Sequence, residues 1–309
     1  MKKWILSVLL LSVVSGFTAG AAPTQTSISL SPFSNMKVAG TFSVSLVRGS
    51  DYRALVTVEE TYMDYIVCQV TDGVLNINID ERRVPAEIKR QFRGKGTPDP
   101  AFSAVIYVPE LIRSVELDGK AVLCDSEDVF DKGRVTFDLD DSSNMKNVEI
   151  SSQEVELSLQ NKSTADVKVS CKKLAVDTSN SSSLIIEEDS EDSSYSLQGS
   201  SKIVAKSHAV HMEIKTKANA SMTLYGTGDS ITYNLSGTSE VNALSFEVPD
   251  AKITMTSVCA LYQSAYRSLT LNLNGGSALY FTNEPQVSIE NIKSSTVSRV
   301  SNGAAARKS

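Results

Sequence analysis

The chain has 309 residues, of which 36 are acidic and 30 are basic, and its formal net charge is −6 at neutral pH. This negative charge disfavours binding to nucleic acid and to anionic membrane surfaces. Four cysteines are too few for a disulfide framework in a chain of this length, so we expect one bridge at most.

Residues 1–21 have the order of a secretory signal peptide. Lys2 and Lys3 precede an apolar run from Trp4 to Val14, and small residues follow. Neither this run nor any later stretch has the ~20 consecutive apolar residues that a membrane-spanning helix needs. We therefore expect an exported protein without a membrane span, in the periplasm or on the outer cell surface. Removal of the two lysines takes the formal net charge to −8.

Residues 22–116 contain stretches of alternating apolar and polar residues, as in 75–79 and 102–108, which are typical of strands with one buried face. We expect this part to form irregular first coils and a cap. Within it, residues 82–100 are a basic insertion in an otherwise acidic protein, and Pro85 can begin a short helix there.

Residues 117–301 contain an internal repeat of seven positions: apolar or Thr, any, turn-former, any, small, any, apolar. It recurs at intervals of 18–22 residues, most often 19. The third position favours turn or left-handed backbone, the fifth is small, and the seventh is expected to point inward. The repeats begin at Leu117, Leu139, Leu159, Thr178, Leu197, Thr216, Leu235, Met255, Leu273 and, more faintly, Ile292.

A repeat of about 19 residues made of short strands and corners leaves no room for a crossover helix. The sequence therefore predicts an all-β fold, a single-stranded parallel β-helix (β-solenoid) of about ten coils. We favour the right-handed form because the hexapeptide period expected of left-handed coils is not seen. Residues 302–309 are expected to be a polar tail.

Asp138, Asp140 and Asp141 are the candidate catalytic residues, because enzymes built on parallel β-helices often use clustered aspartates on glycosidic bonds. Strand alternation places Asp138 and Asp140 on the outer face of one coil and Asp141 at its corner. Hydrolysis needs an acid and a base about 5–9 Å apart. At equivalent positions of the adjacent coils we identify no basic or carboxylate partner, so a solvated acidic face is the preferred interpretation.

Two other groups of polar residues are weaker candidates. His208, His211 and Glu213 fall short of a convincing metal-ligand pattern and indicate surface positions. The acidic residues between Glu187 and Asp192 indicate a solvated face or weak calcium binding. We expect no cofactor and no resident metal ion.

Three segments resemble the head (GIN) domain family of auto-transporter adhesins: 33–49 (FSNMKVAGTFSVSLVRG), 108–111 (VPEL) and the corner 118–121 (DGKA). The likeness extends over nearly the whole chain after the predicted signal peptide. The Ser-Gly-Ser corner of that family appears here as Asp-Gly-Lys. The resemblance implies an exported β-helical protein of a Gram-negative cell envelope with an adhesive role, and it implies no catalytic residues.

These observations favour a non-catalytic binding protein whose rigid side wall meets a protein or glycan ligand. The alternative is a polysaccharide-active hydrolase or lyase that uses the Asp138, Asp140 and Asp141 cluster. A third hypothesis is a homo-oligomer in which the basic insertion of one copy docks on the acidic wall of another.

Overall fold

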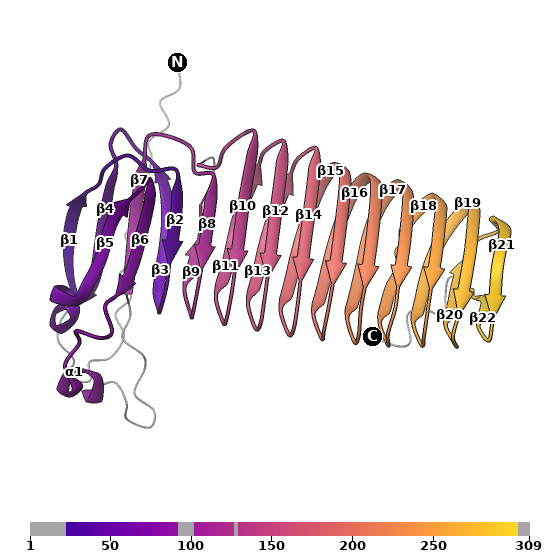
Figure 1. Cartoon of the computed structure of the whole chain (residues 1–309). Coiled ribbons are helices and arrows are strands. Elements are labelled where there is room, and N and C mark those ends of the chain that lie inside the picture. Colours follow the sequence, from indigo (N-terminus) through magenta and orange to yellow (C-terminus); the bar gives the residue numbers. More distant parts are fainter. Residues whose placement is uncertain (1–22, 92–101, 127–128, 302–309) are drawn as a thin grey trace, which may run out of the picture.

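The computed structural model describes residues 23–91, 102–126 and 129–301, so the predicted signal peptide and polar tail lie outside the described residues. The described chain forms a long rod of stacked strands (Figure 1). Its regular part is a parallel β-solenoid of about ten turns, and the predicted fold class is confirmed.

Each coil contains two strand segments joined by a corner, and we call their stacks the upstream face and the downstream face. The upstream face contains β2 (Asn35–Val38), β8 (Ser114–Leu117), β10 (Arg134–Leu139), β12 (Glu154–Leu159) and β14 (Lys173–Thr178). The downstream face contains β3 (Phe42–Arg48), β9 (Val122–Cys124), β11 (Asn144–Ser151) and β13 (Thr164–Ser170).

From Ser183 onward a single long strand serves both faces. The first half of each long strand pairs on the downstream face, and its second half pairs on the upstream face of the next coil. These strands are β15 (Ser183–Leu197), β16 (Lys202–Thr216), β17 (Ser221–Leu235), β18 (Glu240–Met255) and β19 (Ala260–Asn274). β20 (Ala278–Thr282) follows on the downstream face, and β21 (Gln286–Lys293) and β22 (Thr296–Arg299) form the last coil, with β22 stacked on β20.

The third position of the repeat forms a continuous column along the rod. All ten predicted positions from Gly119 to Ser294 have positive φ, and so does Gly40 in the first coil. From Lys120 to Val258, the backbone N–H that follows each corner residue donates to the carbonyl of the corner one coil earlier, for example Lys162 N to Asp141 O at 2.7 Å and Thr238 N to Ala218 O at 2.8 Å. The predicted stacking of the corners is confirmed.

The small fifth position and the apolar seventh position lie inside the rod. Ser143, Ser163 and Ser201 are completely buried in the small column, and the seventh-position residues from Leu123 to Leu279 are buried as well. Where threonine begins a repeat, it bonds to the small column of the next coil, as Thr178 Oγ1 does to Ser201 Oγ at 3.1 Å. This contact explains why threonine replaces an apolar residue there without leaving an unpaired polar atom.

The amino-terminal part, predicted as irregular first coils and a cap, combines parallel and antiparallel strands. β2 and β3 belong to the parallel coils, and β6 (Val74–Ile79) and β7 (Phe102–Val108) pair parallel to them. In contrast, β1 (Pro23–Ser29), β4 (Arg53–Glu59) and β5 (Ile66–Thr71) pair antiparallel to their neighbours. This part is therefore an antiparallel cap added to the first coil.

The reason for the antiparallel pairing is visible at the turn between β5 and β6. Asp72 and Gly73 have φ values of 51° and 75°, as the two central residues of a tight hairpin turn require. A two-residue turn of this kind reverses the chain, whereas parallel neighbours need a long connection.

The basic insertion contains a short helix, α1 (Ala86–Gln91), that begins directly after Pro85, as predicted. Residues 92–100 of the insertion lie outside the described residues. The predicted docking of this insertion on a second copy stays a prediction.

Candidate functional site

A groove with a volume of about 620 Å³ crosses five coils of the upstream face. We call it the polar groove, because its rim carries charged and hydroxyl side chains. Two columns of outward-facing residues form it: Glu154, Lys173, Asp192, His211 and Ser230 in one column, and Glu156, Ala175, Ser194, Glu213 and Thr232 in the other.

The groove arises because small residues interrupt the second column. Ala175 and Ser194 occupy the middle of the column, where the coils before and after carry Glu156 and Glu213. Side chains at these positions point away from the core, so the wall is low where they are small and high where they are long. The parallel register thus places carboxylates at both ends of a shallow floor.

Contacts with neighbouring side chains hold the carboxylates at the two ends of the floor. Glu213 accepts a hydrogen bond from Lys215 Nζ at 2.8 Å and another from Asn234 Nδ2 at 3.2 Å. Glu156 accepts one from Arg134 at 2.7 Å. These pairs are exposed, so each contributes little to stability, but each narrows the positions that the carboxylate takes up at the groove.

Asp192, His211 and Ser230 stand at one register position in three consecutive coils. The Nδ1 atom of His211 lies 2.9 Å from Ser230 Oγ. Within the described part of the chain this is the one side-chain hydrogen bond of His211, and Asp192 is not its partner. The trio therefore lacks the acid–histidine bond that orients the base in a nucleophilic triad. It presents polar groups suited to binding a ligand.

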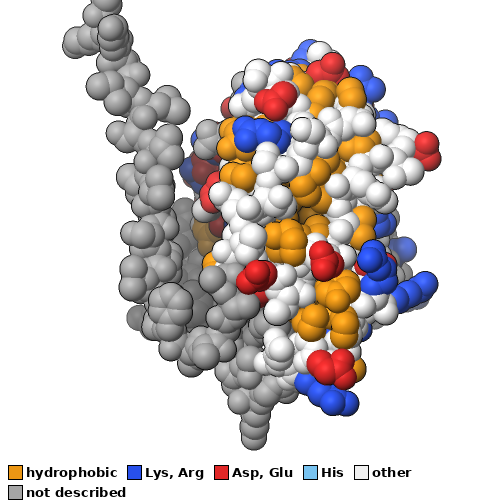
Figure 2. Space-filling view, turned by 90° about the vertical axis from the view of Figure 1, so that its left-hand side faces the viewer, with side chains coloured by type: hydrophobic (Ala, Val, Ile, Leu, Met, Phe, Trp, Pro, Cys, Tyr) orange, Lys and Arg blue, Asp and Glu red, His pale blue; other side chains and the backbone are white. Residues whose placement is uncertain are grey.

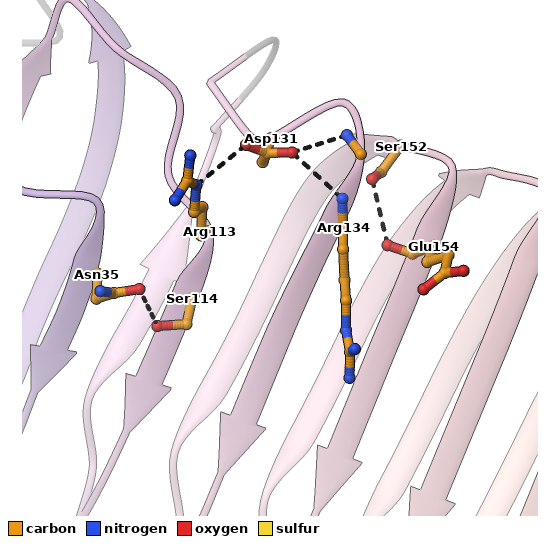
Figure 3. A network of polar contacts seen from close by, with 8 residues as sticks. Asn35, Arg113, Ser114, Asp131, Arg134, Ser152 and Glu154 are labelled. Carbon is orange, nitrogen blue, oxygen red and sulfur yellow. Dashed lines mark hydrogen bonds and ion pairs between the residues drawn. The ribbon is translucent and has the colours of Figure 1, made fainter.

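A polar network orders the coil edge at one end of the groove (Figure 3). Asp131 Oδ1 accepts hydrogen bonds from the backbone N–H groups of Gly133 and Arg134 at 2.7 and 3.2 Å, and Arg113 lies 3.4 Å from Oδ2. These contacts hold the pKa of the Asp131 carboxyl below its usual range, the bond from Gly133 having the largest effect. One coil later, Ser152 Oγ donates to the carbonyl of Glu154, which lines the groove.

Asp138 lies on the exposed outer face of β10, as the alternation predicted. The prediction that the adjacent coils offer Asp138 no carboxylate partner was wrong, because Glu116 of β8 is its direct register partner. Burial raises the pKa of the Asp138 carboxyl, and the neighbouring Glu116 carboxylate raises it further. Lys37 Nζ lies 2.8 Å from a carboxylate oxygen of Glu116. Of the two neighbouring carboxyl groups, Glu116 is thus the one that forms this ion pair with a lysine. A sequence comparison of strand against strand one coil back would have found Glu116.

Asp140 and Asp141 belong to the corner. Asp140 Oδ1 accepts a hydrogen bond from the backbone N–H of Asp141 at 2.7 Å and another from Asn161 Nδ2 of the next coil. Asn161 in turn accepts from Asn180 Nδ2 at 2.9 Å. Asp141 has a φ of 57°. These contacts give both aspartates a place in the ladder of stacked corners.

The acidic stretch between Glu187 and Asp192 is not uniformly solvated, which corrects the predicted acidic face. Glu188 points into the rod and is 2% exposed, because it has the inward register of Leu184 and Ile186. Ser190 Oγ lies 3.2 Å from Glu188 Oε2 and can donate to it. Burial raises the pKa of the Glu188 carboxyl. Strand alternation alone could have placed Glu188 inside.

His208 and His211 lie on the outer surface, as predicted, and His208 Nδ1 lies 3.0 Å from Thr227 Oγ1. Across the described ranges, no group of three or more His, Cys, Asp or Glu residues is arranged to hold a metal ion. All four cysteines are free thiols, and burial raises the pKa of Cys68 to about 11. None of the described helices is both long and apolar enough to cross a membrane.

Comparison with known families finds one match, to the family described as "Putative auto-transporter adhesin, head GIN domain", over residues 32–206 and 166–285. The chain belongs to this GIN-domain family. The two matches overlap over residues 166–206. Such an overlap is expected when the coils resemble one another, because the family pattern can then be aligned to more than one set of coils. No curated protein matches the sequence.

Solved structures share the GIN-domain fold at low sequence identity. One is a "Putative lipid binding protein from Parabacteroides distasonis ATCC 8503", with 14% identity and a TM-score of 0.51 over 90% of this chain and 97% of that one. Another is a "putative adhesin" from the same organism, with 16% identity and a TM-score of 0.50 over 91% and 98%. A "putative adhesin from Parabacteroides merdae ATCC 43184" has 14% identity and a TM-score of 0.50 over 92% and 100%. These likenesses concern the fold.

Proposed function

We propose that this GIN-domain protein is an exported, adhesin-like protein that binds a positively charged segment of another envelope protein in its polar groove. One observation carries the proposal: four carboxylates surround a low floor of small residues in a groove of about 620 Å³. An adhesin-like role agrees with the family, and the choice of ligand rests on the charges of the groove.

The groove favours a cation over a neutral sugar. Four carboxylates of the lining, those of Glu154, Glu156, Asp192 and Glu213, oppose one lysine of the lining, Lys173. Arg134 and Lys215 pair with two of them, so Glu154 and Asp192 supply the excess negative charge. Carboxylates in such an arrangement attract the basic side chains of an approaching partner and orient them. The lining contains no Phe, Tyr or Trp, so the flat apolar platform on which sugar rings stack is missing from this groove.

Export supports a partner in the cell envelope. The order of charged, apolar and small residues in 1–21 is that of a signal peptide, and the family is one of adhesins. We place the protein in the periplasm or on the outer surface of a Gram-negative cell. A rigid rod suits this location, because it holds a binding wall in a constant shape without a hinge.

Calorimetric titration with an oligolysine peptide tests the proposal. We expect saturable binding that weakens with added salt, and the double variant Asp192→Asn with Glu213→Gln should weaken it by at least about tenfold. The control variant Asp177→Asn with Glu240→Gln removes the same charge outside the groove and should bind as the wild type does. Equal losses in both variants, or saturable binding to neutral glycans alone, would contradict the proposal.

Glu116 and Asp138 favour a second candidate function, the hydrolysis of a polysaccharide. In this scheme Asp138, with its raised pKa, gives its proton to the oxygen of the glycosidic bond as the bond breaks. Glu116 takes a proton from a water molecule whose oxygen bonds to the sugar carbon. The pair replaces the predicted trio, because Asp140 and Asp141 are held in the corner ladder.

The release of reducing ends from acidic and neutral polysaccharides tests this second function. Activity that disappears in both Asp138→Asn and Glu116→Gln, and that persists in Asp177→Asn, would support it. Absence of new reducing ends from every polysaccharide would eliminate it and leave the binding function as the proposal.

A further inference from the structure

The carboxyl-terminal end of the rod exposes side chains that elsewhere form the core. In β21, Val287 and Ile292 are 38% exposed and Ile289 is 60% exposed. Their register partners in the preceding coil are Leu269, Leu271 and Leu273, all completely buried. Among the described residues, this end of the rod is an uncovered cross-section of the core, and the outer edges of β21 and β22 have no strand partner.

The amino-terminal end has a different surface. Inward-facing residues of its strands, such as Val56 and Leu75, are completely buried. The 3-10 helix η1 (Glu60–Tyr65) links β4 to β5, and its buried Tyr62 packs edge-on against Phe102 with ring centroids 5.2 Å apart. Figure 2 shows this end, where hydrophobic side chains are interspersed with polar and charged ones. The open end of another coil would therefore find no exposed core to pack against at the amino-terminal end.

We propose that the carboxyl-terminal end is a self-association surface, on which the last coil of a second copy stacks tail to tail. Every coil interface of the rod already joins two surfaces of this kind, apolar columns against apolar columns between paired strand edges. The surface that best complements an open coil is therefore another open coil. The partner is a second copy because this chain itself carries such a surface.

A two-fold axis through both faces makes this contact geometrically possible. It would pair β21 with its own copy antiparallel, and β22 with its own copy on the other face, so both open edges would be closed. The contact also avoids repulsion. Residues 278–301 contain two acidic side chains, Glu284 and Glu290, and two basic ones, Lys293 and Arg299. The end is thus neutral in a protein with net charge −6.

Light scattering after size-exclusion chromatography tests the stoichiometry. We expect the purified protein to have the mass of a dimer, and Ile289→Asp to raise the dissociation constant by at least about 100-fold, because a two-fold interface contains the new carboxylate twice. The control Ile185→Asp introduces the same change at a 54% exposed residue of the side wall and should leave the dimer intact. Matching circular dichroism spectra would show that both variants are folded.

A cysteine cross-link tests the orientation of the two copies. Glu290 lies near the middle of β21, so in Glu290→Cys the two new thiols would meet close to the two-fold axis and form a disulfide-linked dimer on oxidation. A monomer for the wild type at all concentrations would overturn the proposal. So would a ladder of higher oligomers without this cross-link, because head-to-tail stacking leaves the two thiols a rod length apart.

Discussion

Gly237 lies directly over Ala218 in the column of stacked corners. A Cβ atom on Gly237 would lie 2.6 Å from the backbone nitrogen and oxygen of Ala218, closer than real Cβ contacts allow. Gly237 also has a φ of 84°, in the left-handed region that favours glycine. Two separate requirements, close stacking and backbone conformation, therefore select glycine at this corner.

Gly237→Ala should lower the free energy of unfolding by about 2 kcal/mol or more, since the methyl group adds a clash to the cost of left-handed backbone. Gly40→Ala is the matched control: its φ is 82°, but a Cβ there meets nothing within 4 Å. It should lose only about 1 kcal/mol. Urea denaturation of the three proteins measures both values, and equal losses would show that the coils do not stack as closely as described.

Glu188→Gln should stabilise the protein at neutral pH by about 1–3 kcal/mol, because it removes a carboxyl group whose ionised form is disfavoured by burial. The pKa of Glu188 is raised in the folded state, so its contribution to stability is present below the unfolded pKa and is lost as pH rises through the folded pKa. As the pH rises through this range, the melting temperature of the wild type should fall more steeply than that of the variant. Parallel curves would place Glu188 outside the core.

Asp131→Asn should have the opposite pH dependence. Backbone N–H groups and Arg113 lower the pKa of Asp131, so its stabilising effect is present above the unfolded pKa and is lost as pH falls through the folded pKa. We expect the variant to lose about 1 kcal/mol at neutral pH and to equal the wild type in acid. Denaturation at both pH values provides the comparison, and a loss that persists in acid would speak against a charge effect.

Asp140→Ala should lower the free energy of unfolding by about 1–2 kcal/mol, because Asp141 N–H and Asn161 lose their common acceptor. The exposed Asp177→Ala serves as the control and should change stability by less than about 0.5 kcal/mol. A destabilisation no larger than that of the control would show that the hydrogen bonds of Asp140 do not stabilise the corners. Asp140 would then again be a candidate catalytic residue.

The repeat could be predicted from the sequence because each of its positions has a strong local preference. Positive φ selects Gly, Asn and Asp, close stacking selects small residues, and the core selects apolar ones, so the coils and their corners were identified correctly. A cap was predicted, but its antiparallel pairing was missed because its residues alternate as coil strands do. The Asp72–Gly73 pair was the one local signal of a hairpin in this segment.

The polar groove could not be predicted from residue types alone, because its members lie one coil apart and become neighbours only through the strand register. Glu156, Ala175, Ser194 and Glu213 form one column, yet nothing in their local sequence connects them. The Glu116–Asp138 pair was missed for the same reason: 22 residues separate them, at one of the longer intervals of the repeat.

Amide chemical shifts during titration with oligolysine test most directly whether the polar groove binds the ligand. We expect the largest shift changes at Ala175, Ser194 and Glu213, in the floor and at one end of the groove, with smaller changes along the adjacent column. Shift changes confined to the downstream face or to either end of the rod, or none at saturating peptide, would contradict the proposed site.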